Sequence, residues 1–240
     1  MSEINKIVSS AILATGITLG GFFPGYYYYK SKMNLNFVTV KGLSEMDVRA
    51  DLGVWDIKYV VTGNDLPAAQ SQMEKQQKTI IAFLNKFGFN ETEVAVKRTE
   101  TNDRMANPYN SDTNASARYI LTQSIQVTSQ NVDLVEKAVN STGSLIAAGI
   151  VFDSNNYNPV SYIFTKLNSI KPQMLEEATK NASIAANEFA KSSNTKVGKI
   201  RNASQGVFSV LPREQTANAM EMNSIEKKVR VVSTIEYYLD

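Results

Sequence analysis

Residues 118–128, which read RYILTQSIQVT, alternate apolar and polar side chains, and the interpretation of the whole chain starts from them. The apolar members of one parity are Tyr119, Leu121, Ile125 and Val127. A period of two residues places them on one face of a β-strand whose other face is polar. Residues 131–141 then carry apolar side chains at helical spacing. The segment therefore predicts a half-buried strand followed by a short helix.

Outward from this segment, strands and helices alternate along the chain. Further strands are expected at residues 36–44, 50–62, 93–101, 145–152, 160–166, 197–210 and 227–239, and further helices at residues 66–87 and 171–191. The strands alternate in polarity rather than being uniformly apolar, which is typical of antiparallel sheets with one covered face. The sequence thus predicts an α+β fold, a mainly antiparallel sheet with helices packed on one face. Residues 118–210 have the split β-α-β-β-α-β order.

The helix expected at residues 171–191 is the clearest in the chain. Its predicted buried stripe consists of Leu175, Ala178, Ala182, Ala185 and Phe189. Residues at these spacings lie on one side of a helix, and alanine permits a close approach to a sheet.

Cysteine and histidine are both missing from the 240 residues. Without Cys, the chain has no disulfides, thiol catalysis or thiolate metal sites, and without His it has no imidazole base or Ser-His-Asp triad. A charged fraction of 20% beside 43% hydrophobic residues indicates a folded protein. Because no phosphate loop or dinucleotide fingerprint is found either, we expect a protein that is not an enzyme and has no cofactor, metal or small-molecule ligand that the sequence identifies.

The first 33 residues form a separate segment. Residues 7–23 are an apolar run without a charge, just long enough to span a bilayer as a helix. Four aromatic residues placed as an interfacial belt follow: Tyr26, Tyr27, Tyr28 and Tyr29. Since no small-x-small cleavage site follows, we predict an uncleaved signal anchor over residues 1–33 that contacts the lipid bilayer through residues 7–29. A cleaved signal peptide and a buried soluble helix are the alternatives.

Four glycines of the anchor are spaced in two pairs, Gly16 with Gly20 and Gly21 with Gly25. This spacing lets two membrane helices approach closely, but incidental small residues explain it about equally well. The pattern therefore favours self-association only mildly. Positive residues flank both ends of the run almost equally, and we choose the orientation with the short tail inside and the domain outside.

The charge of the chain is concentrated in the anchor. Three of the 25 basic residues and one of the 23 acidic residues lie within residues 1–32, so the remainder carries no net charge. A small basic cluster at Lys196, Lys199 and Arg201 is interpreted as a solvated strand end. No nucleic-acid partner is expected, because its electrostatic signature is missing.

Few residues are candidates for chemistry. Ser193 and Lys196 match the Ser-x-x-Lys of penicillin-binding enzymes, but the Lys-Thr-Gly partner is absent and a helix end is expected there. Asp47, Asp51 and Asp56 lie close in sequence, and carboxylates can bind Ca²⁺ or transfer protons. No Asp-x-Asp-x-Asp-Gly loop accompanies them, so surface charge is the preferred interpretation.

Several of these segments together resemble the SIMPL-domain family of mostly bacterial envelope proteins. The matching pieces are the opening Val38-Thr39-Val40-Lys41-Gly42, the strand and helix at 118–139, the Ala-rich helix at 167–190, Val197-Gly198-Lys199-Ile200 and the last strand. The opening strand departs from the family pattern, because Ser44 stands where the second glycine of Gly-x-Gly is usual. The resemblance covers residues 36–240.

The resemblance implies a SIMPL-like domain at residues 34–240, with a division into subdomains 34–117 and 118–240 considered. It also implies a single-pass protein of the bacterial inner membrane whose C-terminal domain lies in the periplasm. Some members of the family assemble into large homo-oligomeric rings, and links to envelope or oxidative stress are associated with it. No catalytic residue carries over.

Two hypotheses of function follow. The first is a non-enzymatic, membrane-anchored protein whose domains assemble with copies of themselves into a ring. The second is an envelope ligand-binding module or hydrolase, with its site in two polar loops expected at residues 101–117 and 211–226.

Overall fold

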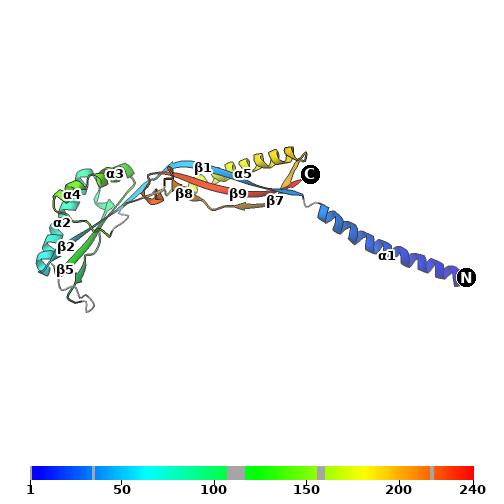
Figure 1. Cartoon of the computed structure of the whole chain (residues 1–240), viewed down its shortest axis with the longest axis horizontal. Helices are drawn as coiled ribbons and strands as arrows, with labels where there is room; N and C mark the ends of the chain where they lie inside the picture. Colours follow the sequence, from blue (N-terminus) through cyan, green and yellow to red (C-terminus); the bar gives the residue numbers. More distant parts are fainter. Residues whose placement is uncertain (1, 34–35, 107–116, 156–159, 217–218) are drawn as a thin grey trace. The chain divides into compact units, whose positions relative to one another are not determined.

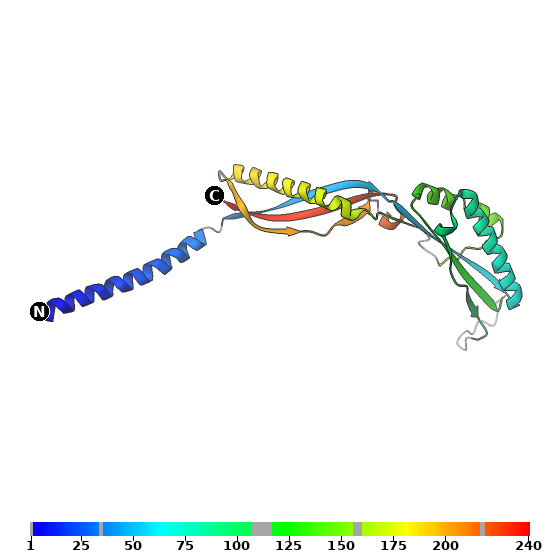
Figure 2. The same cartoon turned by 180° about the vertical axis from the view of Figure 1, so that it is seen from behind.

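The structure, a computed structural model, describes residues 2–33, 36–106, 117–155, 160–216 and 219–240 (Figures 1 and 2). The helices are α1 (Ser2–Met33), α2 (Leu66–Phe87), α3 (Val132–Asn140), α4 (Gly143–Ala147) and α5 (Leu167–Ser192), with 3-10 turns η1 (Glu91–Glu93) and η2 (Glu221–Asn223). The strands are β1 (Phe37–Arg49), β2 (Leu52–Gly63), β3 (Val94–Val96), β4 (Glu100–Asp103), β5 (Tyr119–Ser129), β6 (Val160–Ile163), β7 (Val197–Gln205), β8 (Ser209–Pro212) and β9 (Glu226–Leu239). The fold is α+β with antiparallel sheets, which confirms the predicted class.

The chain divides into two compact units, each assembled from separate segments. Unit 1 consists of Met1–Ser44, Gln173–Phe208 and Val231–Asp240, and unit 2 of Glu45–Pro172 and Ser209–Arg230. Three of the four boundaries fall inside β1, α5 and β9, and the fourth lies between β7 and β8. The subdomains considered from the sequence, 34–117 and 118–240, cut the chain only once, whereas these units each combine early and late residues.

Unit 2 is built on the pairing of β2 with β5. The two strands are antiparallel and in register from Gly53 opposite Ser129 to Gly63 opposite Tyr119. β6 extends the sheet beside β2, and β3 and β4 extend it beside β5. The apolar positions of residues 118–128 face the core of this unit, where Leu121, Ile125 and Val127 of β5 are fully buried. Figure 1 shows α2, α3 and α4 over one side of these strands.

The helices of unit 2 begin and end where local chemistry dictates. The Asp65 side chain accepts a hydrogen bond from the Ala68 amide at 2.9 Å and so caps the start of α2. At the other end Gly88 has a φ of 99°, a left-handed conformation that favours glycine. Asn131 caps α3 in the same way through the Leu134 amide. The caps fix both helices so that their apolar faces close the core over β2 and β5.

Unit 1 contains a sheet in the order β1-β9-β7 with α5 packed against it. The buried stripe of α5 consists of Met174, Ala178, Ala182, Ala186 and Ala190. Ala182 and Ala186 of this stripe pack with Val40 of β1 and with Ile235 and Tyr237 of β9. The predicted stripe was right at Ala178 and Ala182 but wrong at Phe189, whose side chain is 61% exposed. The buried residues recur every four positions and end at Ala190, so Phe189 lies off this row and its ring points to solvent.

Gly42 of β1 lies directly against the backbone of α5. A Cβ atom added at Gly42 would lie 1.8 Å from the carbonyl oxygen of Ala178 and 2.6 Å from the amide nitrogen of Ala182. Both are backbone atoms, so a side chain at residue 42 would displace the helix itself. The glycine of the opening strand is therefore required by packing and not by its φ angle.

The prediction of a strand at residues 145–152 was wrong. This segment forms α4 and then a turn at Gly149, whose φ is 85°. Only its end follows β2, where the Val60 amide donates to the Val151 carbonyl at 2.9 Å. A short apolar run fits a helix as well as a strand, and here the alanines favour helix. The split β-α-β-β-α-β order therefore loses one of its strands.

Two of the expected strands are each divided into two shorter strands, and one expected helix begins earlier. The strand expected at 93–101 is two short strands, β3 and β4, and that expected at 197–210 is β7 followed by β8. The helix expected at 171–191 begins four residues earlier, at Leu167. Gly206 lies in the break between β7 and β8, where a Cβ atom would lie 2.4 Å from the Val232 carbonyl oxygen, so a side chain does not fit there.

We predict that Gly42→Ala destabilises the protein by on the order of 1–3 kcal/mol or more, because the added methyl group overpacks the interface between α5 and β1. Urea unfolding followed by circular dichroism measures the change. The matched control is Gly143→Ala, where nothing lies within 4 Å of the added Cβ atom. Equal unfolding midpoints for the two variants would contradict the packing argument.

Candidate functional site

Helix α1 carries the residues that the sequence assigns to the membrane. Its segment Asn5–Lys30 contains an 18-residue window with a mean hydropathy of 1.6 and is long and apolar enough to cross a bilayer, although a signal sequence has the same properties. At 1.5 Å per residue these 26 residues extend about 39 Å. The helix continues through Pro24 to Met33, so the tyrosines belong to the same helix as the apolar run.

The four tyrosines, Tyr26 to Tyr29, form an exposed collar near the end of α1. Successive residues of a helix are rotated by about 100°, so four in a row point in all directions around the axis. The rings of Tyr26 and Phe22 stack with centroids 5.9 Å apart. Gly16, Gly20, Gly21 and Gly25 have nothing within 4 Å of an added Cβ atom. Packing of a second helix against these glycines stays a prediction.

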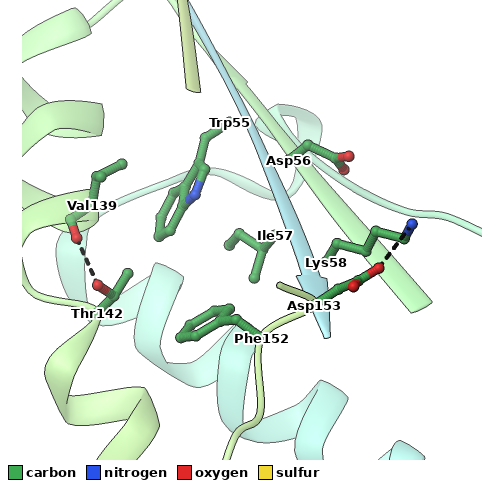
Figure 3. A pocket seen from close by; sticks show the side chains of 8 residues that line it. All are labelled: Trp55, Asp56, Ile57, Lys58, Val139, Thr142, Phe152 and Asp153. Atoms are coloured by element: carbon green, nitrogen blue, oxygen red, sulfur yellow. Dashed lines mark hydrogen bonds and ion pairs between the residues drawn. The ribbon is translucent and has the colours of Figure 1, made fainter. Parts of the chain in front are cut away.

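Unit 2 contains an apolar cavity of about 170 Å³ between β2 and the segment that follows α3. Figure 3 shows Trp55 and Ile57 of β2 facing Phe152 across it, with Val139 and Thr142 along one side. Thr142 donates its hydroxyl to the Val139 carbonyl at 2.9 Å and is therefore satisfied within the wall. Binding pockets for drug-sized molecules measure roughly 300–1,000 Å³, so this cavity suits only a small apolar group.

An ion pair, Lys58 with Asp153, lies at the rim of the cavity (Figure 3). The ammonium and carboxylate are 3.0 Å apart. The hydrogen bond from Lys58 to Asp153, with their mutual attraction, raises the pKa of the lysine above its ordinary value. The pKa of Asp153 is lowered, first by the backbone N–H of Asn155 and then by Lys58. Lys58 therefore stays protonated near neutral pH and is a poor nucleophile or base.

A buried polar pair lies between β2 and β5. The hydroxyl of Tyr59 donates to the side-chain oxygen of Gln123, and the Gln123 amide donates to the Lys97 carbonyl at 3.1 Å. Burial raises the pKa of Tyr59 to about 12. A neutral phenol held in this way is a structural group that satisfies the core.

Only parts of the two predicted loops are loops in the structure. Residues 107–116 of the first loop and 217–218 of the second lie outside the described residues, and residues 101–103 of the first loop belong to β4. In the second loop, residues 211–212 belong to β8 and residues 221–223 form η2. Residues 213–214 and 223–226 line a polar groove of about 380 Å³ together with Glu136 of α3. A ligand site in these loops stays a prediction.

The acidic residues singled out from the sequence have separate partners. Asp47 pairs with Arg213 at 3.5 Å and with Lys228 at 3.7 Å. Asp51 accepts from the amide and the hydroxyl of Thr165, and Asp56 accepts from Ser124. No group of three metal-ligating side chains is found among the described residues. The three carboxylates thus stabilise different contacts of unit 2 and do not converge.

Ser193 of the Ser-x-x-Lys match caps the end of α5. Its hydroxyl donates to the carbonyl oxygens of Phe189 and Ala190 at 2.9 and 3.2 Å. The hydroxyl also lies 3.0 Å from that of Thr195. These contacts assign Ser193 a capping role at the place where a helix end was expected.

Lys227 is a buried cation that the sequence analysis missed. It has no exposed surface, and its ammonium group donates to the backbone carbonyl and the carboxylate of Glu221. A signal was present, because Lys227 shares the parity of the buried Val229 and Val231 in β9. The pair fastens η2 to β9 within unit 2.

Comparison with known proteins gives one family. The model of the family SIMPL, described as "Protein of unknown function (DUF541)", matches residues 38–237. No curated protein matches the chain.

We predict that Asp153 makes the stability of the protein depend on pH in the acidic range. Its pKa in the folded state is below the ordinary 3.8, so its contribution is complete above that value and is lost as the pH falls through the lower folded-state pKa. Melting temperatures between pH 7 and pH 3 should therefore converge for the wild type and Asp153→Asn as the pH falls.

The control for this prediction is Lys58→Met. It removes the ion pair but keeps the Asn155 hydrogen bond, so it should reproduce only part of the effect of Asp153→Asn. A constant difference between wild type and Asp153→Asn over the whole pH range would refute the assignment.

Proposed function

Because the chain belongs to the SIMPL family, we propose that it is a non-enzymatic, membrane-anchored envelope protein whose domain assembles with copies of itself into a large ring. The family match and the apolar helix α1 support a membrane-anchored envelope protein. The self-assembly is supported by one observation, the exposed edge of the sheet in unit 1.

Strand β7 is that edge. Among the described strands it pairs with β9 on one side only, and residues 199–205 are exposed on both faces. Its register is irregular up to Asn202 and regular from Asn202 to Gln205, a stretch without charged residues. Unpaired backbone groups on such an edge are a template for another strand.

The second edge of the same sheet is β1. Pairing of β7 of one copy with β1 of the next is a head-to-tail contact between two different surfaces. Contacts of this kind generate closed rings when the rotation between copies closes. A pairing of β7 with β7 would instead stop at a dimer.

The proposed function also includes a location for the anchor and for the domain. The anchor is retained in the bacterial inner membrane, and the domain lies in the periplasm, where the protein acts under envelope or oxidative stress. Alkaline carbonate extraction reports on retention of the anchor. Protease access in intact and opened spheroplasts reports on the side of the domain.

We predict that the full chain in detergent has a mass by light scattering that is a multiple of its 26.5 kDa. Asn202→Lys combined with Ser204→Lys should reduce the mass severalfold, because like charges at an edge oppose strand pairing. The control variant combines Gln173→Lys with Thr179→Lys, which adds the same charge at exposed positions of α5. Monomers in the wild type, or equal masses for the two variants, would refute assembly through β7.

The second candidate is an envelope ligand-binding module, favoured by the apolar cavity beside Trp55. Trp55 is the single tryptophan of the chain, is 3% exposed and lines the cavity, so its emission responds to a molecule bound there. If the cavity binds apolar groups, hexanol should shift this emission with saturation. Val139→Phe should abolish the response, and Val151→Phe, at an exposed position, should preserve it. A linear, unsaturable response would exclude the cavity as a site.

A further inference from the structure

Four segments meet at one end of unit 1. The Leu239 amide donates to the Asn36 carbonyl at 2.9 Å, which places the end of β9 beside the start of β1. Lys196 and Asp240 exchange two backbone hydrogen bonds of 3.0 and 2.9 Å, which adds the start of β7. The Thr195 amide binds the Ala190 carbonyl and adds the end of α5. We call residues 36–39, 188–201 and 236–240 the tether end.

The chain connects this end directly to α1. Helix α1 ends at Met33 and β1 begins at Phe37, so four residue steps separate them. Four steps of chain span at most about 14 Å. If α1 crosses a bilayer, as the proposed function holds, the tether end is confined to the neighbourhood of the lipid headgroups.

The tether end exposes side chains of the types that are common where proteins meet the membrane–water interface. Large apolar and aromatic side chains are exposed on it: Phe37 at 42%, Phe189 at 61%, Ile200 at 53% and Tyr238 at 36%. Phe37 and Tyr238 lie on strands, whereas Phe189 lies on α5, so the exposed rings come from different sides of the same end. Aromatic side chains of this kind favour the boundary between lipid and water.

Basic residues are exposed in the same end as these apolar groups: Lys191, Lys196, Lys199 and Arg201. The tether end also contains three acidic residues, Glu188, Glu236 and Asp240. Arg201 lies 4.0 Å from the centre of the Phe37 ring and pairs with Glu236 at 3.6 Å, so the three lysines of the tether end are its principal cations. Lysines near a bilayer attract anionic headgroups.

We propose that the tether end is a lipid-binding surface, which holds the folded domain against a bilayer containing anionic phospholipids. The exposed aromatic rings enter the headgroup region, and Lys191, Lys196 and Lys199 bind phosphate groups. This contact is separate from the insertion of α1, because it involves only residues of the folded domain. It rests on the proposed anchoring by α1, which supplies the proximity.

The absence of cysteine allows single labelling sites in the full chain. Ser192→Cys places a fluorophore at the tether end, and Gln205→Cys places it at the far end of β7, about 25 Å along the strand. The full chain is reconstituted in vesicles of phosphatidylcholine with about 30% phosphatidylglycerol and a nitroxide on some headgroups. Quenching should be severalfold stronger at residue 192 than at residue 205.

Two sets of substitutions test the chemistry. Lys191→Gln, Lys196→Gln and Lys199→Gln together should roughly halve the quenching at residue 192 and remove its dependence on phosphatidylglycerol. Lys75→Gln, Lys78→Gln and Lys86→Gln on α2 change the charge equally and should leave the quenching unchanged. Phe189→Ser should weaken the quenching without altering its salt dependence.

Flotation of the same vesicles separates the two proposals. Protein that floats after carbonate treatment but shows equal quenching at residues 192 and 205 overturns the lipid-binding surface and leaves the anchor intact. Protein that does not float overturns the anchor and the surface with it. Quenching at residue 192 that depends on protein density and not on the lipid nitroxide assigns the tether end to a contact between copies and overturns the proposal.

Discussion

The contact between the backbone of α5 and Gly42 of β1 is the constraint on which unit 1 depends. A residue without a side chain faces a helix whose buried stripe is almost entirely alanine, and both features are needed for the distance between them. The helix lies over β1 and β9, where Val40, Ile235 and Tyr237 complete the core. Phe189 of α5 lies off this stripe and is left in solvent. The exposed surfaces of unit 1 are thus a consequence of how closely its covered face is packed.

That geometry also leaves β7 uncovered. A helix that lies close over β1 and β9 does not reach the third strand, and residues 199–205 are exposed on both faces. An uncovered edge opposite β1 supports assembly with further copies, whereas the crowded end beside α1 supports contact with lipid. The two proposals therefore use different parts of the same unit. Unit 2 contains ion pairs among its own residues, such as Lys58 with Asp153 and Lys227 with Glu221.

The buried polar residues of the strands show what the alternation of apolar and polar residues can and cannot predict. The parity that predicts the buried face of β5 from Leu121 and Ile125 also contains Gln123, and the parity of Val229 and Val231 also contains Lys227. Alternation assigns all of these residues to the core. It does not supply the partners that make burial of a polar group tolerable, which are Tyr59 for Gln123 and Glu221 for Lys227. Those partners lie on other elements and become neighbours only when the strands pair.

The sequence by itself determined the features that depend on local periodicity: the long apolar helix at the N-terminus, the half-buried strand at residues 118–128, the helix that follows it and the α+β class. The tertiary structure alone decided three others. Residues 145–152 form a helix and a turn because a short apolar run fits either structure until neighbours select one. Gly42 is required by a helix more than 130 residues away along the chain. The division into two units, each made of early and late segments, follows from long-range pairing, which no local pattern records.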